Sequence, residues 1–269
     1  MSLEITSLKN PRLKILINLQ KSKDRREAGL FIVEGIREIS LAQESGFEIE
    51  SFFVCPEIFK QDKNYSINLN AKDILHLPSA VFSKVAYREN TGGIIAVAKI
   101  KSTALSDLPK RIYTERSRSE NPLYLILEKV EKPGNIGAIL RTADAAGVDG
   151  VIVCDPATDF YNPNVIRSSV GCVFTVPIAT ATNQEVLDWC TTNNITTFAT
   201  SLIAKNEYQN SNFKNPSAIL MGSESFGLSD FWMTKSNQQI IIPMRGKIDS
   251  MNVSNAAAVV VFEAVRQRG

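Results

Sequence analysis

Short apolar runs alternate with amphipathic segments along the second half of the chain, starting at Leu123. Each run is brief, mostly aliphatic and bounded by turn residues, which predicts a buried strand. The predicted strands are 123–127, 151–154, 173–176, 196–199, 218–221 and 240–242, and the predicted helices are 136–146, 164–169, 184–191 and 256–266. Buried strands that alternate with helices predict an α/β fold, in which a parallel sheet carries helices on both faces.

The first hundred residues carry a less regular pattern. After Pro11, the side chains of Leu13, Leu16 and Ile17, with Leu19 as a further candidate, form one apolar stripe, which predicts a helix with a basic outer face. Strands are predicted at 30–33, 52–55 and 92–97, and helices at 36–43 and 79–85. These elements predict a small α/β unit that ends near Lys99.

A polar stretch separates the two patterns. Residues 101–121 contain one proline and a charge-rich end, and the pattern changes after them, so we interpret them as a linker. The alternative is a surface loop within one domain. The predicted domains are therefore residues 1–100 and 122–269, joined by the linker 101–121.

The composition is that of a globular protein, with 44% hydrophobic and 22% charged residues in a chain of 269. The four cysteines are widely spaced and His76 is the single histidine, so we expect free thiols in a reducing compartment and no metal site. No apolar segment is long enough to cross a bilayer, and the N-terminus lacks the features of a signal peptide. We therefore expect a cytoplasmic protein without a membrane partner.

Basic residues gather in the front half. Residues 1–120 contain 19 Lys and Arg against 15 Asp and Glu, whereas residues 121–269 contain 11 against 13. Seven of the basic residues lie between Lys9 and Arg26. Such a cluster fits either contact with nucleic-acid phosphates or an ordinary solvated helix face, and charge alone does not decide between them.

Polar loops follow three of the predicted strands, at the carboxyl edge where ligands bind in parallel sheets. The loop after 123–127 contains Asn135, which can cap the next helix, and Arg141 lies further along that helix. The loop after 218–221 places Glu224 between two glycines. Each loop alone is typical of a helix-capping turn.

The third loop, residues 243–251, is irregular because a proline, a glycine and polar residues interrupt it, and Asn252 or Ser254 can cap the helix that follows. Three such loops at one edge predict a nucleotide-like ligand held by backbone groups. No strand is followed by the GxGxxG of a dinucleotide site, and the loop around Glu224 lacks the lysine of a phosphate-binding P-loop.

These loops belong to three longer segments, Asn135–Gly147, Leu220–Asp230 and Ile242–Ala264. In order and in context they resemble the three motifs of the SpoU or TrmH class of RNA 2′-O-ribose methyltransferases, in the SPOUT superfamily. The segment Arg167–Ile178 is similar to the stretch that connects these motifs in the family. The resemblance covers about residues 123–266, and the front half resembles, less specifically, an L30e-like substrate-binding domain.

The resemblance implies a Rossmann-like C-terminal domain with a deep trefoil knot, which binds S-adenosylmethionine and forms a homodimer with the site near its interface. Residues at the family's cofactor-binding positions are Gly222, Ile242, Met244, Ser250 and Met251. Residues at its catalytic positions are Asn135, Arg141, Glu224, Ser250 and Asn252. Met251 stands where leucine is usual, and that change conserves volume.

Methyl transfer to a ribose 2′-OH requires loss of the hydroxyl proton or stabilisation of the developing alkoxide. Histidine is the usual general base, but His76 lies in the front domain. Arg141, Glu224 and Asp249 remain as candidates for the base. Because arginine stays protonated below a pH of about 12, we hypothesise that Arg141 chiefly binds the substrate phosphate and stabilises the alkoxide.

A 2′-OH substrate marks RNA rather than DNA. By analogy with the L30e-like front half, ribosomal RNA is the expected substrate. Transfer RNA is the alternative, and an RNA-binding or ribosome-assembly protein that has lost turnover is a second one. A third, methyl transfer to a small molecule, would leave the basic front domain without a role.

Overall fold

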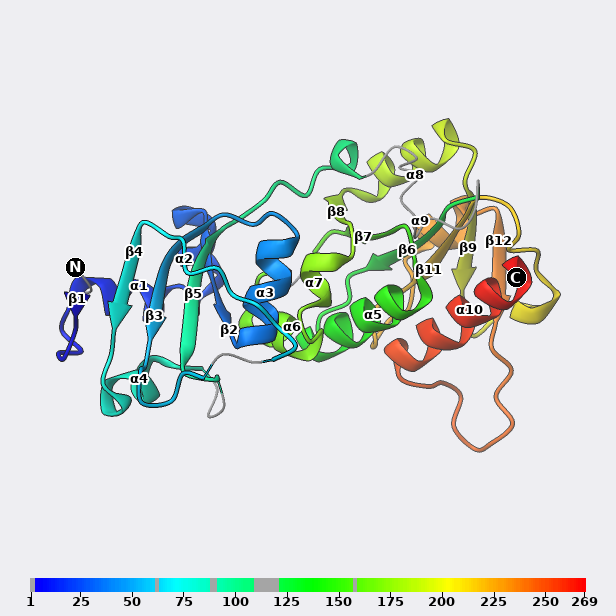
Figure 1. Ribbon diagram of the computed structural model, residues 1–269. Coiled ribbons are helices and arrows are strands. Elements are labelled where there is room, and N and C mark those ends of the chain that lie inside the picture. The colour runs from blue at the N-terminus through cyan, green and yellow to red at the C-terminus, as the bar shows by residue number, and fades with distance from the viewer. Residues whose placement is uncertain (1–2, 61–62, 88–90, 109–120, 157–158) are drawn as a thin grey trace. The chain divides into compact units, whose positions relative to one another are not determined.

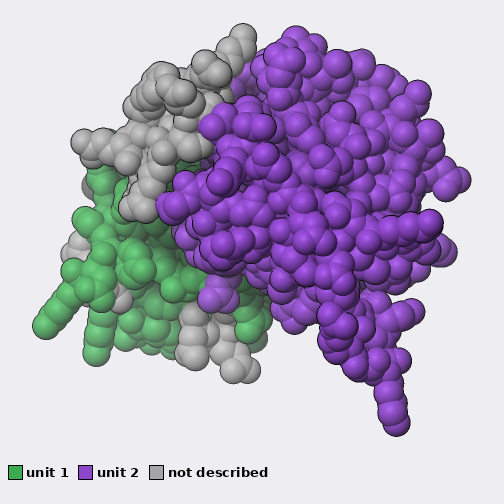
Figure 2. All heavy atoms as spheres, turned by 90° about the vertical axis from the view of Figure 1, so that its right-hand side faces the viewer, with its two compact units in different colours: residues 1–101, 159–175 green, residues 102–158, 176–269 purple. Residues whose placement is uncertain are grey.

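The computed structural model describes residues 3–60, 63–87, 91–108, 121–156 and 159–269 (Figure 1). The chain forms two compact units, coloured separately in Figure 2. Unit 1 comprises residues 1–101 together with 159–175, and unit 2 comprises residues 102–158 and 176–269. Of the predicted linker, residues 109–120 lie outside the described residues.

Unit 1 contains a mixed five-stranded sheet with the order β1-β4-β3-β5-β2. Strand β5 is antiparallel to β2 and β3, whereas β3 and β4 are parallel. The strands are β1 (Leu3–Glu4), β2 (Leu30–Glu34), β3 (Ile49–Val54), β4 (Asp73–His76) and β5 (Ile94–Lys99). The helices are α1 (Pro11–Asn18), α2 (Ser22–Ala28), α3 (Ile36–Glu44), α4 (Ser79–Val85), α6 (Pro163–Ser168) and α7 (Cys172–Thr175).

Helix α1 begins where the sequence predicts. The fixed φ of Pro11 suits the first helical position, and the side chain of Asn10 accepts a hydrogen bond from the backbone N of Arg12 at 2.9 Å. Leu13 and Leu16 are buried in the core of unit 1, as the apolar stripe predicts. Ile17 is 41% exposed, so its assignment to that stripe is wrong.

The segment 159–175 belongs to unit 1 by its contacts, although it lies within the predicted C-terminal domain of the sequence. The buried guanidinium of Arg25 forms an ion pair with Asp159 at 2.6 Å. The rings of Tyr161 and Phe174 pack against Phe31, with centroids 4.3 and 6.0 Å away. The strand predicted at 173–176 is therefore wrong, because Phe174 enters this aromatic cluster from the short helix α7.

A four-residue apolar run does not by itself distinguish a strand from a buried helical turn. Here Val170 and Gly171 both have positive φ, 59° and 87°, and this backbone turn starts α7. One edge strand of the unit 2 sheet is instead β8 (Ile178–Ala181), which lies just after α7 in the sequence and was not predicted.

Unit 2 contains a seven-stranded sheet with the order β10-β12-β9-β11-β6-β7-β8, and all of these pairings are parallel. Its strands are β6 (Leu123–Glu128), β7 (Gly150–Cys154), β8, β9 (Thr196–Thr200), β10 (Asn206–Glu207), β11 (Ser217–Met221) and β12 (Gln238–Ile241). Its helices are η1 (Leu105–Asp107), α5 (Pro133–Ala146), α8 (Asn183–Thr192), η2 (Tyr208–Asn210), α9 (Asp230–Lys235) and α10 (Val253–Arg268). The predicted α/β fold with a parallel sheet is confirmed.

Helices cover both faces of this sheet. Alternate side chains of β6, Tyr124 and Ile126, pack in one core cluster with Val186 of α8 and Trp232 of α9. On the other face α5 lies beside α10, as Figure 1 shows. The central strands are consequently buried along their whole length, and β11 is an example.

Candidate active site

Side chains from the three predicted loops meet in one chain of hydrogen bonds. The amide nitrogen of Asn135 donates to Oε1 of Glu224 at 2.5 Å. The amide nitrogen of Asn252 donates to Oδ1 of Asn135 at 3.2 Å. These two bonds join residues that are 89 and 117 positions apart in the sequence, at the carboxyl edge of the unit 2 sheet. We call Glu224, Asn135 and Asn252 the amide relay.

Asn135 takes part in this relay because it does not cap its helix. Helix α5 begins earlier than predicted, at Pro133, with Lys132 at the capping position and no side-chain cap. The prediction that Asn135 caps the helix is therefore wrong. Its side chain, placed in the first turn, uses its amide nitrogen and its oxygen to link the other two loops.

Asn252 does cap α10, as one of the two predicted alternatives. Its Oδ1 accepts hydrogen bonds from the backbone N of Ser254 at 2.9 Å and from the Ser254 hydroxyl at 2.6 Å. These two bonds fix the side-chain oxygen and direct the amide nitrogen toward Asn135. The helix cap thereby orients one end of the relay.

The loop that carries Glu224 is closed on itself. The backbone groups of Ser223 and Gly227 exchange two hydrogen bonds, each of 3.0 Å. Gly227 has a φ of 69°, which suits glycine. A Cβ on Gly222 would lie 2.1 Å from the carbonyl carbon of Gly227, so this position has no room for any side chain. The loop therefore presents Glu224 in a fixed position.

Glu224 is ionised at neutral pH. Partial burial raises its pKa, but hydrogen bonds from Asn135 and from backbone N–H groups, together with the nearby charge of Lys132, outweigh burial and lower the pKa below the ordinary value. A carboxylate with a lowered pKa is a weak proton acceptor. Glu224 is accordingly better suited to orient Asn135 than to serve as the general base.

Arg141 lies apart from the amide relay. It is six residues beyond Asn135 on α5, so the two positions differ by about 9 Å along the helix axis and by about a third of a turn. Its side chain is exposed, and within the described part of the chain it forms no hydrogen bond or ion pair. The guanidinium is thus available to an external group such as a phosphate.

The third loop also leaves its polar groups available. Ile242, Met244 and Met251 are half-buried, whereas Ser250 is exposed and donates to Asp249 at 3.0 Å. In the described part of the chain, the backbone N–H and C=O groups of residues 244–250 form no hydrogen bond with other backbone groups. These backbone groups can bind water or the polar edge of a ligand.

These features fit S-adenosylmethionine. Gly222 allows the close backbone contact with Gly227 that shapes the Glu224 loop, Ile242, Met244 and Met251 provide apolar contact, and the third loop supplies free N–H and C=O groups. Ser250 donates a hydrogen bond to Asp249, and among the described residues it forms none with another predicted site residue. In the described residues no group of three or more His, Cys, Asp or Glu could hold a metal ion, and no helix is long and apolar enough to cross a membrane.

Glu128 is a buried residue of this edge that the sequence reasoning missed. Its carboxylate accepts hydrogen bonds from the backbone N of Ser229 at 2.7 Å, from the Ser229 hydroxyl at 2.6 Å and from Asn183 at 2.7 Å. It therefore holds the downstream end of the Glu224 loop. An acidic residue that ends a buried strand is the signal that could have identified it.

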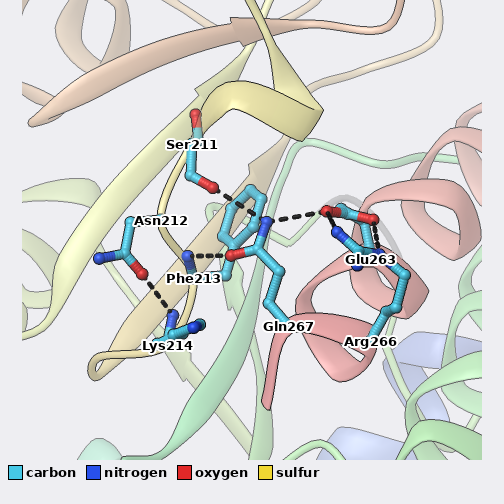
Figure 3. A network of polar contacts seen from close by, with 7 residues as sticks. All are labelled: Ser211, Asn212, Phe213, Lys214, Glu263, Arg266 and Gln267. Carbon is cyan, nitrogen blue, oxygen red and sulfur yellow. Dashed lines mark hydrogen bonds and ion pairs between the residues drawn. The ribbon is translucent and has the colours of Figure 1, made fainter. Parts of the chain in front are cut away.

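A second polar network anchors the far end of α10 (Figure 3). Oε1 of Gln267 accepts a hydrogen bond from the backbone N of Phe213, and its amide nitrogen donates to the carbonyl of Ser211 and to Glu263. Hydrogen bonds from Arg266 and Gln267 lower the pKa of Glu263 to about 2. Since α10 carries Asn252 at its other end, these contacts help to hold the relay in place.

Comparison with known proteins agrees with this geometry. Residues 122–262 match the SpoU rRNA Methylase family, and residues 10–96 match the MRM3-like substrate binding domain. The 23S rRNA (uridine(2479)-2′-O)-methyltransferase of Streptomyces viridochromogenes is 32% identical over 252 residues, which cover 91% of this chain and 85% of that protein.

Two solved structures resemble the whole chain. A crystal structure of an RNA 2′-O ribose methyltransferase is 38% identical, with a TM-score of 0.81 and 99% of both chains covered. An AdoMet-bound rRNA methyltransferase from Sinorhizobium meliloti is 30% identical, with a TM-score of 0.86, and the match covers 98% of this chain and 97% of that one. With three motif loops converging on one relay and a match of this extent, the chain belongs to the SpoU rRNA methylase family.

Proposed function

We propose that this protein transfers a methyl group from S-adenosylmethionine to the 2′-OH of a ribose in ribosomal RNA. The observation that carries the proposal is the amide relay, because it joins all three motif loops of the family at one sheet edge. The relatives support the choice of RNA, since one is named a 23S rRNA 2′-O-methyltransferase.

The bound cofactor supplies an electrophilic methyl group on a sulfonium. The residues that hold the cofactor are Gly222, Ile242, Met244, Ser250 and Met251, and Ser250 lies two positions before the relay residue Asn252. Glu224, ionised, fixes the orientation of Asn135. The relay thereby presents two amides, from Asn135 and Asn252, as fixed polar groups for the ribose.

Arg141 binds the substrate phosphate and stabilises the oxygen as the 2′-OH loses its proton. The lowered pKa of Glu224 makes its carboxylate a weak proton acceptor. The proton of the 2′-OH passes to solvent as the oxygen takes up the methyl group that the bound cofactor would supply.

Unit 1 supplies electrostatic affinity for RNA. Six of the seven basic residues of the N-terminal cluster are exposed, whereas Arg25 is buried against Asp159. The exposed ones are Lys9, Arg12, Lys14, Lys21, Lys23 and Arg26. Such residues bind phosphates without reading the sequence.

We further propose that the protein acts as a cytoplasmic homodimer through its C-terminal domain, which contains the trefoil knot. The distance of about 9 Å along α5 between Arg141 and Asn135 supports this, because a second copy could supply the guanidinium. On α10, Phe262 is 48% exposed and could enter such an interface. Light scattering of the purified protein tests this proposal, because a homodimer has twice the mass of one chain.

The experiment that tests the function maps 2′-O-methylated nucleotides in ribosomal and transfer RNA from cells with and without the protein. We expect a ribosomal RNA position to lose its methyl group when the protein is absent, and purified protein with S-adenosylmethionine to restore it. Loss of a transfer RNA methyl group instead would assign the other substrate. Unchanged methylation in both RNAs would favour a binding protein without turnover.

A further inference from the structure

Phe226 is unusually exposed for an aromatic residue beside an active site. Its side chain is 90% exposed, the highest value among the large hydrophobic residues that the structure describes. It also forms no ring contact with another described aromatic side chain. Exposing a phenyl ring to water is unfavourable, so the side chain of Phe226 does not stabilise the isolated chain.

The backbone imposes this exposure. The loop is closed by the paired hydrogen bonds between Ser223 and Gly227, and the backbone N of Phe226 donates to the hydroxyl of Ser223 at 3.2 Å. Close contact of Gly222 with Gly227 limits the adjustment of the loop. A loop backbone held this way loses little conformational entropy when the ring binds a partner.

The ring lies close to the reacting centre. Phe226 follows Glu224 by two residues, so their Cα atoms are at most about 7 Å apart. The carboxylate of Glu224 is turned to Asn135, within the amide relay. A flat group stacked on Phe226 would consequently sit beside the nucleotide whose ribose is methylated.

The surroundings favour a nucleobase as that group. The neighbours of the ring in this loop are polar, Ser223, Glu224 and exposed Ser225, so they offer no apolar patch for a protein surface. The ionised carboxylate of Glu224 repels a phosphate. A base has a π-face that stacks on phenylalanine and carries no negative charge.

We infer that Phe226 is a stacking platform for a base next to the methylated nucleotide, and hence that the substrate position lies in an unpaired or splayed-out segment of the RNA. The inference rests on the proposed function and adds the substrate class to it. Bases within a continuous A-form helix are stacked on each other and cannot reach a side chain in this way.

A substitution series at this position tests the inference. The probe is ribosomal RNA from cells that lack the protein, with labelled S-adenosylmethionine, and the measurement is kcat/KM for the RNA. Phe226→Ala should lower it by about 5- to 140-fold, which corresponds to ~1–3 kcal/mol per stacked base. Phe226→Leu should be similarly impaired, whereas Phe226→Tyr and Phe226→Trp should retain activity within a few fold.

Other outcomes separate the possible errors. Binding of S-adenosylmethionine alone, measured by calorimetry, should be unchanged in the alanine variant, which checks that the loop is intact. If the leucine variant is as active as wild type, Phe226 contributes apolar contact and not stacking, and the inference is overturned. It is also overturned if the alanine variant is fully active. If wild type methylates no RNA, the proposed function itself fails.

Discussion

Replacing Asn135 with aspartate should make the activity depend on protonation of the relay. The amide nitrogen of Asn135 donates to Glu224 at 2.5 Å, and its oxygen accepts from Asn252. In the Asn135→Asp variant, a carboxylate oxygen replaces the amide nitrogen that donates to Glu224. Two carboxylates then face each other. The relay is broken while both residues are ionised, but a proton shared between them restores the donor.

The size of this effect follows from the geometry. Two unit charges that relax to about 4 Å repel by about 1 kcal/mol in water and about 4 kcal/mol at an effective dielectric constant near 20. Glu224 and Asn135 are half-buried, so solvent screening places the repulsion between these limits. At about 1.4 kcal/mol per pKa unit, this repulsion should raise the upper pKa of the carboxyl pair above the ordinary value of a carboxyl group.

The assay is single-turnover methyl transfer to ribosomal RNA, measured from pH 5 to 9 for both proteins. The ratio of the variant rate to the wild-type rate should be low at pH 8 and should rise as the pH falls through the pKa of the pair. Asn135→Ala is the matched control, because it cannot hold a proton and its ratio should stay low throughout. A pH-independent ratio for Asn135→Asp, or full activity at pH 8, would refute the role of the relay.

Three further predictions concern the site and its supports. Arg141→Ala should leave the affinity for S-adenosylmethionine nearly intact and lower the methyl transfer rate by about 100-fold or more; collapse of cofactor binding by calorimetry would contradict this role. Gly222→Ala should weaken cofactor binding by about 10-fold or more, because its Cβ would lie 2.1 Å from the Gly227 backbone, while Gly134→Ala, with nothing within 4 Å, should bind normally. Glu263, whose pKa is lowered to about 2, should stabilise the fold above its unfolded pKa and lose this contribution as the pH falls from about 4.5 to 2. In urea unfolding, Glu263→Gln should therefore be less stable than wild type by about 1–3 kcal/mol at pH 7 and nearly equal near pH 2, and a difference that persists there would contradict the reasoning.

Much of the fold was determined by local sequence signals. Strands such as β6 and β7 are continuous apolar runs, and such runs fit only a sheet that is covered on both faces. Pro11 and Asn252 specify helix starts through chemistry that acts over a few residues. The three motif loops carry enough residues in a fixed order to indicate the family, because each element there is specified locally.

What the sequence did not determine depends on contacts between distant residues. The stretch 173–176 has the composition of a strand, but residues 173–175 belong to helix α7 in unit 1, where Phe174 packs beside Phe31. Burial of Arg25 also follows from a partner 134 positions away, Asp159.

The same distinction applies to the site. The motifs name Asn135, Glu224 and Asn252, but only the tertiary structure shows that they bond to each other. It also shows that Arg141 lies apart from them on the same helix. Hydrogen bonds act over about 3 Å, and which side chains come that close is set by the packing of the whole sheet, which no local pattern encodes.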